Sequence, residues 1–233
     1  MAIEGTATSG AAETHFDPSL FDGEIAAHGT PARWRKAVLC PCLNLITNAP
    51  DPNCPYCTEY SGTIWDDSGV DDLRVLAAGR RRQDLYDQNG HLLKGMVTLT
   101  FPSTVLPAHH DQIELTAALM VINAEQHIRG QIDPAQRSTE RLRMPTVLDV
   151  DDCEAIVAGV RTQYVLGTDF TLDENNAVLW ANGPPDGTLY TVRYTARPVY
   201  VCWSPESRDE DATKQPYRVI AQRLDFFRQQ PVD

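Results

Sequence analysis

The feature that most constrains this chain is a cluster of cysteines. Four of its six cysteines, Cys40, Cys42, Cys54 and Cys57, lie within eighteen residues. Between the two pairs, residues 48–53 consist of Asn, Ala, Pro and Asp, which favour turns and bend the chain back. Four converging thiolates suit a tetrahedral zinc ion, whose binding contributes on the order of 10 kcal/mol to folding. The cluster therefore predicts a structural zinc site in residues 40–57, here called the cysteine knuckle.

Two other interpretations of the cysteine knuckle stay open. Only one residue separates Cys40 from Cys42, whereas zinc sites usually have a wider gap. Disulfides would need a crossed pairing such as Cys40 with Cys57, because a bond between Cys-x-Cys neighbours is strained. The tetrapeptide from Cys54 to Cys57, Cys-Pro-Tyr-Cys, is also what glutaredoxins carry at their redox site. A redox dithiol needs a strand before it and a helix that begins at its first cysteine, and the flanking residues predict neither.

Length and segment composition limit the class of protein. The chain has 233 residues, enough for one large domain or two small ones. No run approaches ~18 consecutive apolar residues, and the first residues lack the basic and apolar regions of a secretory signal. We therefore expect a protein that is made in the cytoplasm and does not enter a membrane.

The chain is acidic, with a net charge of -12 and an isoelectric point near 4.8. A protein that grips nucleic acid through its phosphates requires a basic surface, so this charge argues against such a role. It is compatible with a surface that DNA passes without sticking, because an acidic surface repels the duplex.

The N-terminal segment, residues 1–30, predicts a flexible arm followed by a short helix. Residues 1–15 are mostly small and polar, which is typical of an arm. Asp17 can cap a helix in which Pro18 takes the first position, and Gly29 can end it.

The rest of the chain predicts a mainly β protein built from barrel or sandwich modules. Residues 31–128 form the first β domain, with the cysteine knuckle inserted between two strands and alternating apolar residues at 96–101 and 112–122. Residues 129–146 read as a long exposed loop, a second extended arm. Residues 147–233 form a second β module, with strands at 147–157 and 164–170 and a final strand at the C-terminus.

Three further sets of residues have simple structural interpretations. His109 and His110 form a turn, because adjacent histidines seldom share one metal ion. Cys153 and Cys202 are buried thiols, with a bond to another subunit as the alternative. Five aromatic residues of the second module serve core and cross-strand packing: Trp180, Tyr190, Tyr194, Tyr200 and Trp203.

The sequence carries no common catalytic signature. It lacks a glycine-rich dinucleotide or phosphate loop, a His-Glu-x-x-His motif and a Gly-x-Ser-x-Gly motif. We therefore predict that the chain is not an enzyme, and keep an enzyme with an unrecognised site as an alternative.

Two regions of the sequence resemble virion proteins of tailed bacteriophages. The first runs Ala-Val-Leu-Cys-Pro-Cys at 37–42, Pro-Asp-Pro-Asn-Cys-Pro-Tyr-Cys at 50–57 and Gly62, and is similar to a cysteine-bearing loop in such proteins. The second is similar to a β module found in components that join head to tail, and comprises residues 164–170, 178–180, 184–194 and 198–200.

The resemblance implies a neck protein, either the adaptor on the portal or the stopper beneath it. Such a protein is expected in the virion as a ring of six or twelve copies, in contact with portal, neck or tail proteins, with DNA passing through its lumen. The arms at 1–15 and 129–145 would then link subunits.

Two alternatives to a neck protein stay open. One is a tail or baseplate component. The other is a zinc-ribbon module that binds a protein or nucleic acid through a basic face, for which Arg33, Arg35 and Lys36 are available.

Overall fold

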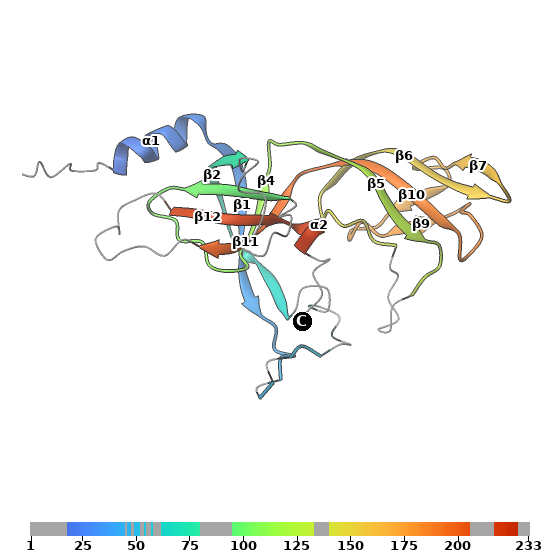
Figure 1. Ribbon diagram of the computed structural model, residues 1–233, viewed down its shortest axis with the longest axis horizontal. Helices are drawn as coiled ribbons and strands as arrows, with labels where there is room; N and C mark the ends of the chain where they lie inside the picture. The colour runs from blue at the N-terminus through green and yellow to red at the C-terminus, as the bar shows by residue number, and fades with distance from the viewer. Residues whose placement is uncertain are drawn as a thin grey trace, which may run out of the picture.

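The protein is mainly β, with a closed barrel, a four-stranded sheet and a projecting loop (Figure 1). The computed structural model describes residues 18–44, 46–47, 49–51, 54, 57, 62–79, 95–132, 140–205 and 217–227. The predicted fold class is confirmed: barrel, short N-terminal helix and cysteine knuckle are all present. The N-terminal arm, residues 1–15, lies outside the described residues, as does Asp17.

Six antiparallel strands close the barrel. Their order is β1 (Thr30–Leu39), β2 (Thr63–Gly79), β3 (Met96–Phe101), β12 (Tyr217–Arg223), β11 (Val199–Pro205) and β4 (Gln112–Leu115). Alternate apolar residues of these strands fill the interior, including Val75, Leu99, Phe101, Ile113 and Val219, which are fully buried. The period-two pattern in the sequence therefore places one face of each strand inside the barrel.

The second sheet lies beside the barrel (Figure 1) and has the order β5 (Met120–Ile128), β10 (Leu189–Ala196), β6 (Val147–Val157) and β7 (Val160–Gln163). A short hairpin of β8 (Phe170–Leu172) and β9 (Val178–Trp180) accompanies it. Tyr190 and Tyr194 of β10 are buried in the core of this sheet, as their aromatic pattern predicts. Val199 and Val201 of β11 join the same core, whereas Cys202 faces the barrel interior. Strand β11 therefore contributes to both cores.

The sequence pattern led us to expect a first β unit that ends at residue 128 and a second that begins at residue 147. The strands do not divide there, because each sheet takes strands from both parts of the chain. The apolar run at 112–122 splits into β4 in the barrel and β5 in the second sheet, with a turn between them. The C-terminal strand, β12, returns to the barrel and pairs with β3 and β11. Alternation identifies a strand from local residues, but pairing depends on residues far away in the chain.

The two described helices are short. Helix α1 (Pro18–His28) buries Ile25, and the amide of Gly29 donates to the Ile25 carbonyl at 2.8 Å. A Cβ atom at Gly29 would lie 2.3 Å from that oxygen, so glycine is required where the helix ends. Helix α2 (Leu224–Phe227) follows β12 directly, where we expected the strand to continue. Neither of these helices is long and apolar enough to cross a membrane.

Two segments differ from the sequence expectation. Residues 164–169 do not form a strand: residues 167–169 are a turn, and the Val165 amide donates to the Asp169 carboxylate at 2.8 Å. We expected an exposed loop at 129–146. This prediction is wrong for the end of the segment, where Leu142 and Met144 are fully buried in the core of the second sheet. Residues 133–139 of that loop lie outside the described part of the chain.

Candidate metal centre

The cysteine knuckle projects from the barrel between β1 and β2 (Figure 1). Its base is closed by strand pairing, with Leu39 opposite Thr63, and by the Cys40 amide, which donates to the Gly62 carbonyl at 2.8 Å. Gly62 has a φ of 82°, and a Cβ there would lie 2.6 Å from a methyl group of Leu43. A larger residue at this position is therefore both strained and crowded.

The four predicted cysteines converge. Their Sγ atoms all lie within 4.8 Å of one another, with 3.7 Å between Cys40 and Cys54 and 3.2 Å between Cys42 and Cys57. When four sulfurs surround a zinc ion tetrahedrally, each about 2.3 Å from it, the sulfurs lie roughly 3.8 Å from one another. The observed separations fit such an ion with small adjustments, so the cluster can hold a metal.

Where the structure describes it, the backbone around the sulfurs is held by hydrogen bonds between residues close in the chain. The Leu43 amide donates to the Cys40 carbonyl at 3.1 Å, and the Cys54 amide donates to the Asp51 carbonyl at 3.0 Å. Cys40, Cys54 and Cys57 are buried, and among the described residues only Cys42 and Ile64 pack against them as partly buried apolar neighbours. Among the described residues this apolar cluster is small, and burial of its few side chains gives the loop little support.

The burial of Cys57 favours its neutral thiol. Desolvation raises its pKa well above the ordinary value, and the neighbouring thiols, Cys42 first among them, raise it further. A divalent cation has the opposite effect, because it binds thiolates and displaces their protons. Metal binding at this site should therefore release protons and weaken as the pH falls.

The structure bears on both alternative interpretations of the knuckle. All six cysteines are free, and sulfur–sulfur contacts join Cys40 with Cys54 at 3.7 Å and Cys42 with Cys57 at 3.2 Å. Cys54 and Cys57 lie in turn and loop structure, and neither described helix begins at them. The helix dipole that a redox dithiol requires is therefore not supplied by α1 or α2.

A buried carboxylate that the sequence pattern did not identify anchors the strand that leads into the knuckle. Asp111 accepts hydrogen bonds from Trp34 Nε1, the Ala37 amide and the Ala108 amide, each at 2.8 Å. Trp34 and Ala37 lie 77 and 74 residues away in the chain, so no local spacing signals this role. Asp111 fastens the turn before β4 to strand β1.

The adjacent histidines lie in that turn, as predicted. The rings of His109 and His110 have centroids 3.9 Å apart and are tilted by 33° to one another, and the His110 ring lies 3.3 Å from the Thr63 hydroxyl. Burial lowers the pKa of His110, and His109 lowers it further. The pair packs beside the base of the knuckle and contributes no ligand to the sulfur cluster.

The remaining two cysteines lie in separate cores, which confirms the prediction of buried thiols. Cys153 belongs to the core of the second sheet and Cys202 to the barrel interior, both without exposed surface. Burial raises the pKa of Cys153 to about 12, with nearby carboxylates adding to the shift. Neither thiol is placed to ligate the cluster.

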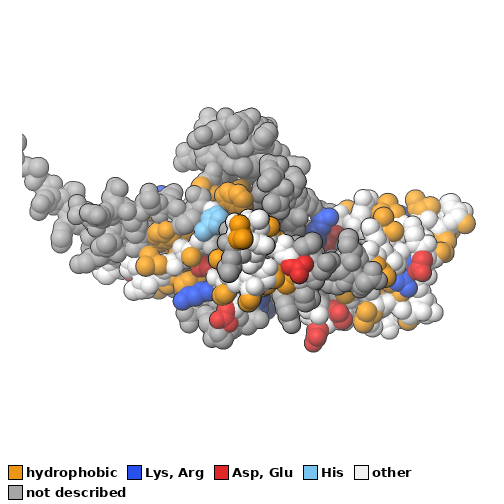
Figure 2. All heavy atoms as spheres, turned by 90° about the horizontal axis from the view of Figure 1, so that it is seen from below, with side chains coloured by type: hydrophobic (Ala, Val, Ile, Leu, Met, Phe, Trp, Pro, Cys, Tyr) orange, Lys and Arg blue, Asp and Glu red, His pale blue; other side chains and the backbone are white. Residues whose placement is uncertain are grey.

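The tip of the knuckle exposes an apolar side chain. Ile46 has 94% of its surface accessible, and the Asn44 side chain accepts hydrogen bonds from the Ile46 and Thr47 amides at 2.9 and 3.1 Å. Leu39, at the base, is also largely exposed. Seen from below, hydrophobic and histidine side chains lie together in the middle of the face (Figure 2). Ile46 and Leu39 thus give the knuckle exposed apolar surface.

Comparison with known proteins gives no further assignment. No protein-family model matches this chain, and no curated protein matches it significantly.

Proposed function

We propose that this chain is a structural, non-catalytic protein of a tailed-bacteriophage virion. In this proposal it forms part of the neck ring that joins head to tail, as six or twelve copies, with portal, neck or tail proteins as neighbours. The resemblance to such proteins of residues 37–42, 50–57 and 62 and of residues 164–170, 178–180, 184–194 and 198–200 supports the neck. The observation that carries the structural role is the knuckle, in which four converging sulfurs can hold a loop that exposes the apolar side chain of Ile46.

The metal in this proposal is zinc. Four sulfur ligands favour zinc or iron over magnesium and calcium, which take oxygen ligands. Zinc has no redox chemistry and serves in sites closed by four protein ligands, as this one is. Its role would be to fix the loop, with Cys40, Cys42, Cys54 and Cys57 as ligands.

Two properties of the surface support assembly into a ring through which DNA passes. Large apolar side chains are exposed both on the knuckle and on the second sheet, as on surfaces that bind other proteins. The net charge of -12 suits a lumen that repels the duplex and lets it slide.

The proposal is tested on the particle. Purified virions from the phage that encodes this chain should contain it, and an electron-dense label on its C-terminus should mark the junction of head and tail. Label at the distal tail would favour the tail or baseplate alternative. Virions that lack the chain, or turnover of a substrate by the pure protein, would contradict the proposal.

A further inference from the structure

The four sulfurs of the cysteine knuckle differ in their access to solvent. Cys40, Cys54 and Cys57 are buried, with 4%, 6% and 0% of their surface exposed, whereas Cys42 is only partly buried. A bound divalent cation keeps cysteine ligands as thiolates, the form of cysteine that reacts with oxidants. A small oxidant in the solvent therefore meets Cys42 first.

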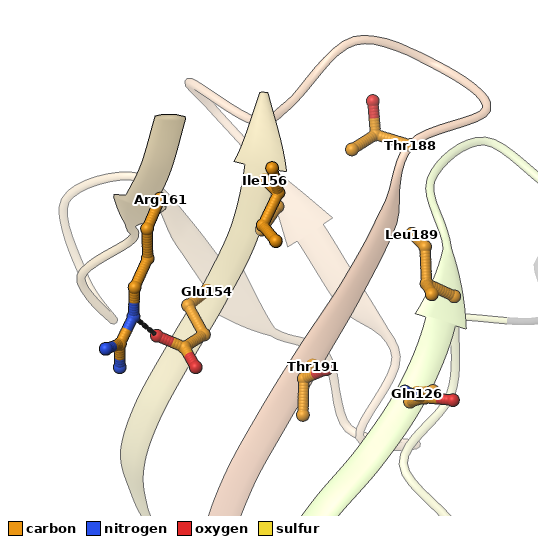
Figure 3. A pocket seen from close by; sticks show the side chains of 8 residues that line it. Gln126, Glu154, Ile156, Arg161, Thr188, Leu189 and Thr191 are labelled. Carbon is orange, nitrogen blue, oxygen red and sulfur yellow. Dashed lines mark hydrogen bonds and ion pairs between the residues drawn. The ribbon is translucent and has the colours of Figure 1, made fainter. Parts of the chain in front are cut away.

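The two cysteines outside the knuckle are shielded from solvent. Cys153 and Cys202 have no exposed surface and lie in separate cores. Next to Cys153 in β6, Glu154 lies on the outer face of the second sheet, where it pairs with Arg161 beside a hollow of about 500 Å³ (Figure 3). Alternation along the strand turns Cys153 to the other side, into the core. The chain thus contains two buried thiols with which the reactivity of the knuckle can be compared.

Each sulfur of the knuckle has a second sulfur close to it. Cys42 Sγ lies 3.2 Å from Cys57 Sγ, and Cys40 Sγ lies 3.7 Å from Cys54 Sγ. A disulfide bond is about 2.05 Å long, so the two sulfurs of each pair need to approach by only roughly 1 to 2 Å. Both pairs join the first half of the knuckle to the second, as a metal ion between the four sulfurs would. The same loop can therefore be closed by a metal or by two disulfides.

We infer that the knuckle is a redox switch, in which a peroxide converts the thiolates that hold the metal into two disulfides. Cys42 pairs with Cys57, and Cys40 pairs with Cys54. A sulfur in a disulfide is no longer a thiolate ligand, so the first bond leaves two thiolates for a metal that requires four ligands, and the metal is released. This inference rests on the proposed zinc site and does not depend on the place of the chain in a virion.

The chemistry balances with hydrogen peroxide as the oxidant. The Cys42 thiolate attacks one oxygen of the peroxide, the O–O bond breaks, hydroxide leaves, and Cys42 becomes a sulfenic acid. The Cys57 thiolate then attacks the Cys42 sulfur, the S–S bond forms, the S–O bond breaks, and a second hydroxide leaves. Two thiolates thus lose two electrons to one molecule of peroxide. A second molecule oxidises Cys40 and Cys54 in the same way.

The test uses the full chain, purified with its metal under reducing conditions and then freed of reductant. Hydrogen peroxide is added in steps, and a chromophoric chelator measures the zinc that is released. Free thiols are alkylated in denaturant with one reagent, disulfides are reduced and alkylated with a second, and mass spectrometry locates both labels. The first equivalent of peroxide should release about one zinc per chain and bring the second label to Cys42 and Cys57. The next equivalent should bring it to Cys40 and Cys54, and dithiothreitol with added zinc should reverse both steps.

Two variants that each lack one ligand form a matched pair. Cys54→Ser keeps both Cys42 and Cys57, so peroxide should still join these two. Cys42→Ser keeps only buried sulfurs in the knuckle, and it should lose free thiols at least about tenfold more slowly than Cys54→Ser does. Both variants lose one ligand, so the number of ligands does not explain a difference between them.

Several outcomes would overturn the inference. They are a different first pair, disulfides that form while the metal stays bound, equal rates in the two variants, and oxidation of Cys153 and Cys202 along with the knuckle. Zinc content is measured before peroxide is added, and a parent without metal would overturn the inference together with the proposed zinc site. The neck proposal is decided separately, by the label on the virion.

Discussion

The barrel and the cysteine knuckle reach rigidity by different means. The barrel buries large side chains such as Leu99 and Phe101, contributed by strands far apart in the chain. In the part of the knuckle that the structure describes, three buried cysteines within eighteen residues pack with only Cys42 and Ile64. A barrel core is cooperative, so damage to it affects every strand. The sulfur cluster of the knuckle is local, so its loss need not affect the barrel. Because the two regions are stabilised independently, a projecting loop can be rigid without a hydrophobic core of its own.

Loss of the metal should have the largest effect, and a local one. Elemental analysis of the parent should find about one zinc per chain. Cys57→Ser or a strong chelator should remove it, and amide hydrogen exchange in peptides spanning the knuckle should then approach the unprotected rate, because on the order of 10 kcal/mol of binding free energy is lost there. Exchange in β3 and β12 should stay unchanged.

The matched control is Cys153→Ala, which removes a buried thiol from the second sheet and should leave the zinc content unchanged. Acidification should release zinc as chelation does, since protons compete for thiols whose pKa is raised by burial. Iron in place of zinc would contradict the assignment of the metal. Absence of metal together with no titratable thiols in the knuckle would instead establish disulfides.

A cavity in the barrel should have the opposite effect to metal loss: it should lower the stability of the whole fold and leave the zinc site intact. Phe101 is fully buried, and Phe101→Ala should lower the free energy of unfolding by about 3–5 kcal/mol. Urea denaturation followed by circular dichroism measures this loss. The folded variant should retain its zinc, because no ligand is touched.

The exposed residue Leu106 supplies the control for that experiment. Leu106→Ala should leave the urea midpoint close to that of the parent, since the side chain is 59% exposed and leaves no cavity. Loss of zinc from folded Phe101→Ala protein would show that the two regions are coupled, and the distinction between them would fail.

Local features of the fold were predictable from the sequence, and the candidate site was among them. Strands β3 and β6 have the predicted bounds, Met96–Phe101 and Val147–Val157, because alternation and turn residues are properties of neighbouring residues. The four sulfurs meet because their ligand spacing and the turn between them are also local. A site held by one short segment is the most favourable case for sequence reasoning.

What the sequence pattern missed depends on distant partners. β11 and β12 complete a barrel begun by β1 and β2, and no residue within these strands specifies that pairing. Asp111 bonds to residues more than 70 positions away. Glu140 lies in a segment whose sequence predicts a polar loop, yet it is 2% exposed. Its carboxylate can be buried because the Tyr190 hydroxyl and the Trp180 indole donate hydrogen bonds to it. A charged residue in a loop gives no local sign that such donors will surround it.

Glu140 also gives the smallest and most specific test of the comparison, since it stabilises the second sheet through hydrogen bonds without any metal. One carboxylate oxygen accepts from the Gly130 amide at 2.8 Å and from Arg129, and the other accepts from Trp180 Nε1 at 2.8 Å and the Tyr190 hydroxyl at 2.9 Å. Glu140→Gln keeps the shape but replaces one acceptor by an amide donor, which then faces a fixed N–H in either orientation. The variant should lose about 1–3 kcal/mol of stability.

Urea denaturation followed by tryptophan fluorescence suits this measurement, because Trp180 is one of the donors. Glu154→Gln is the matched control on the same sheet: its partner Arg161 lies at the surface, where ion pairs contribute little, so the midpoint should not move. Zinc content should be normal in both variants. Equal effects of the two substitutions would contradict the prediction, because they would show that the buried Glu140 contributes no more to the stability of the second sheet than Glu154 does.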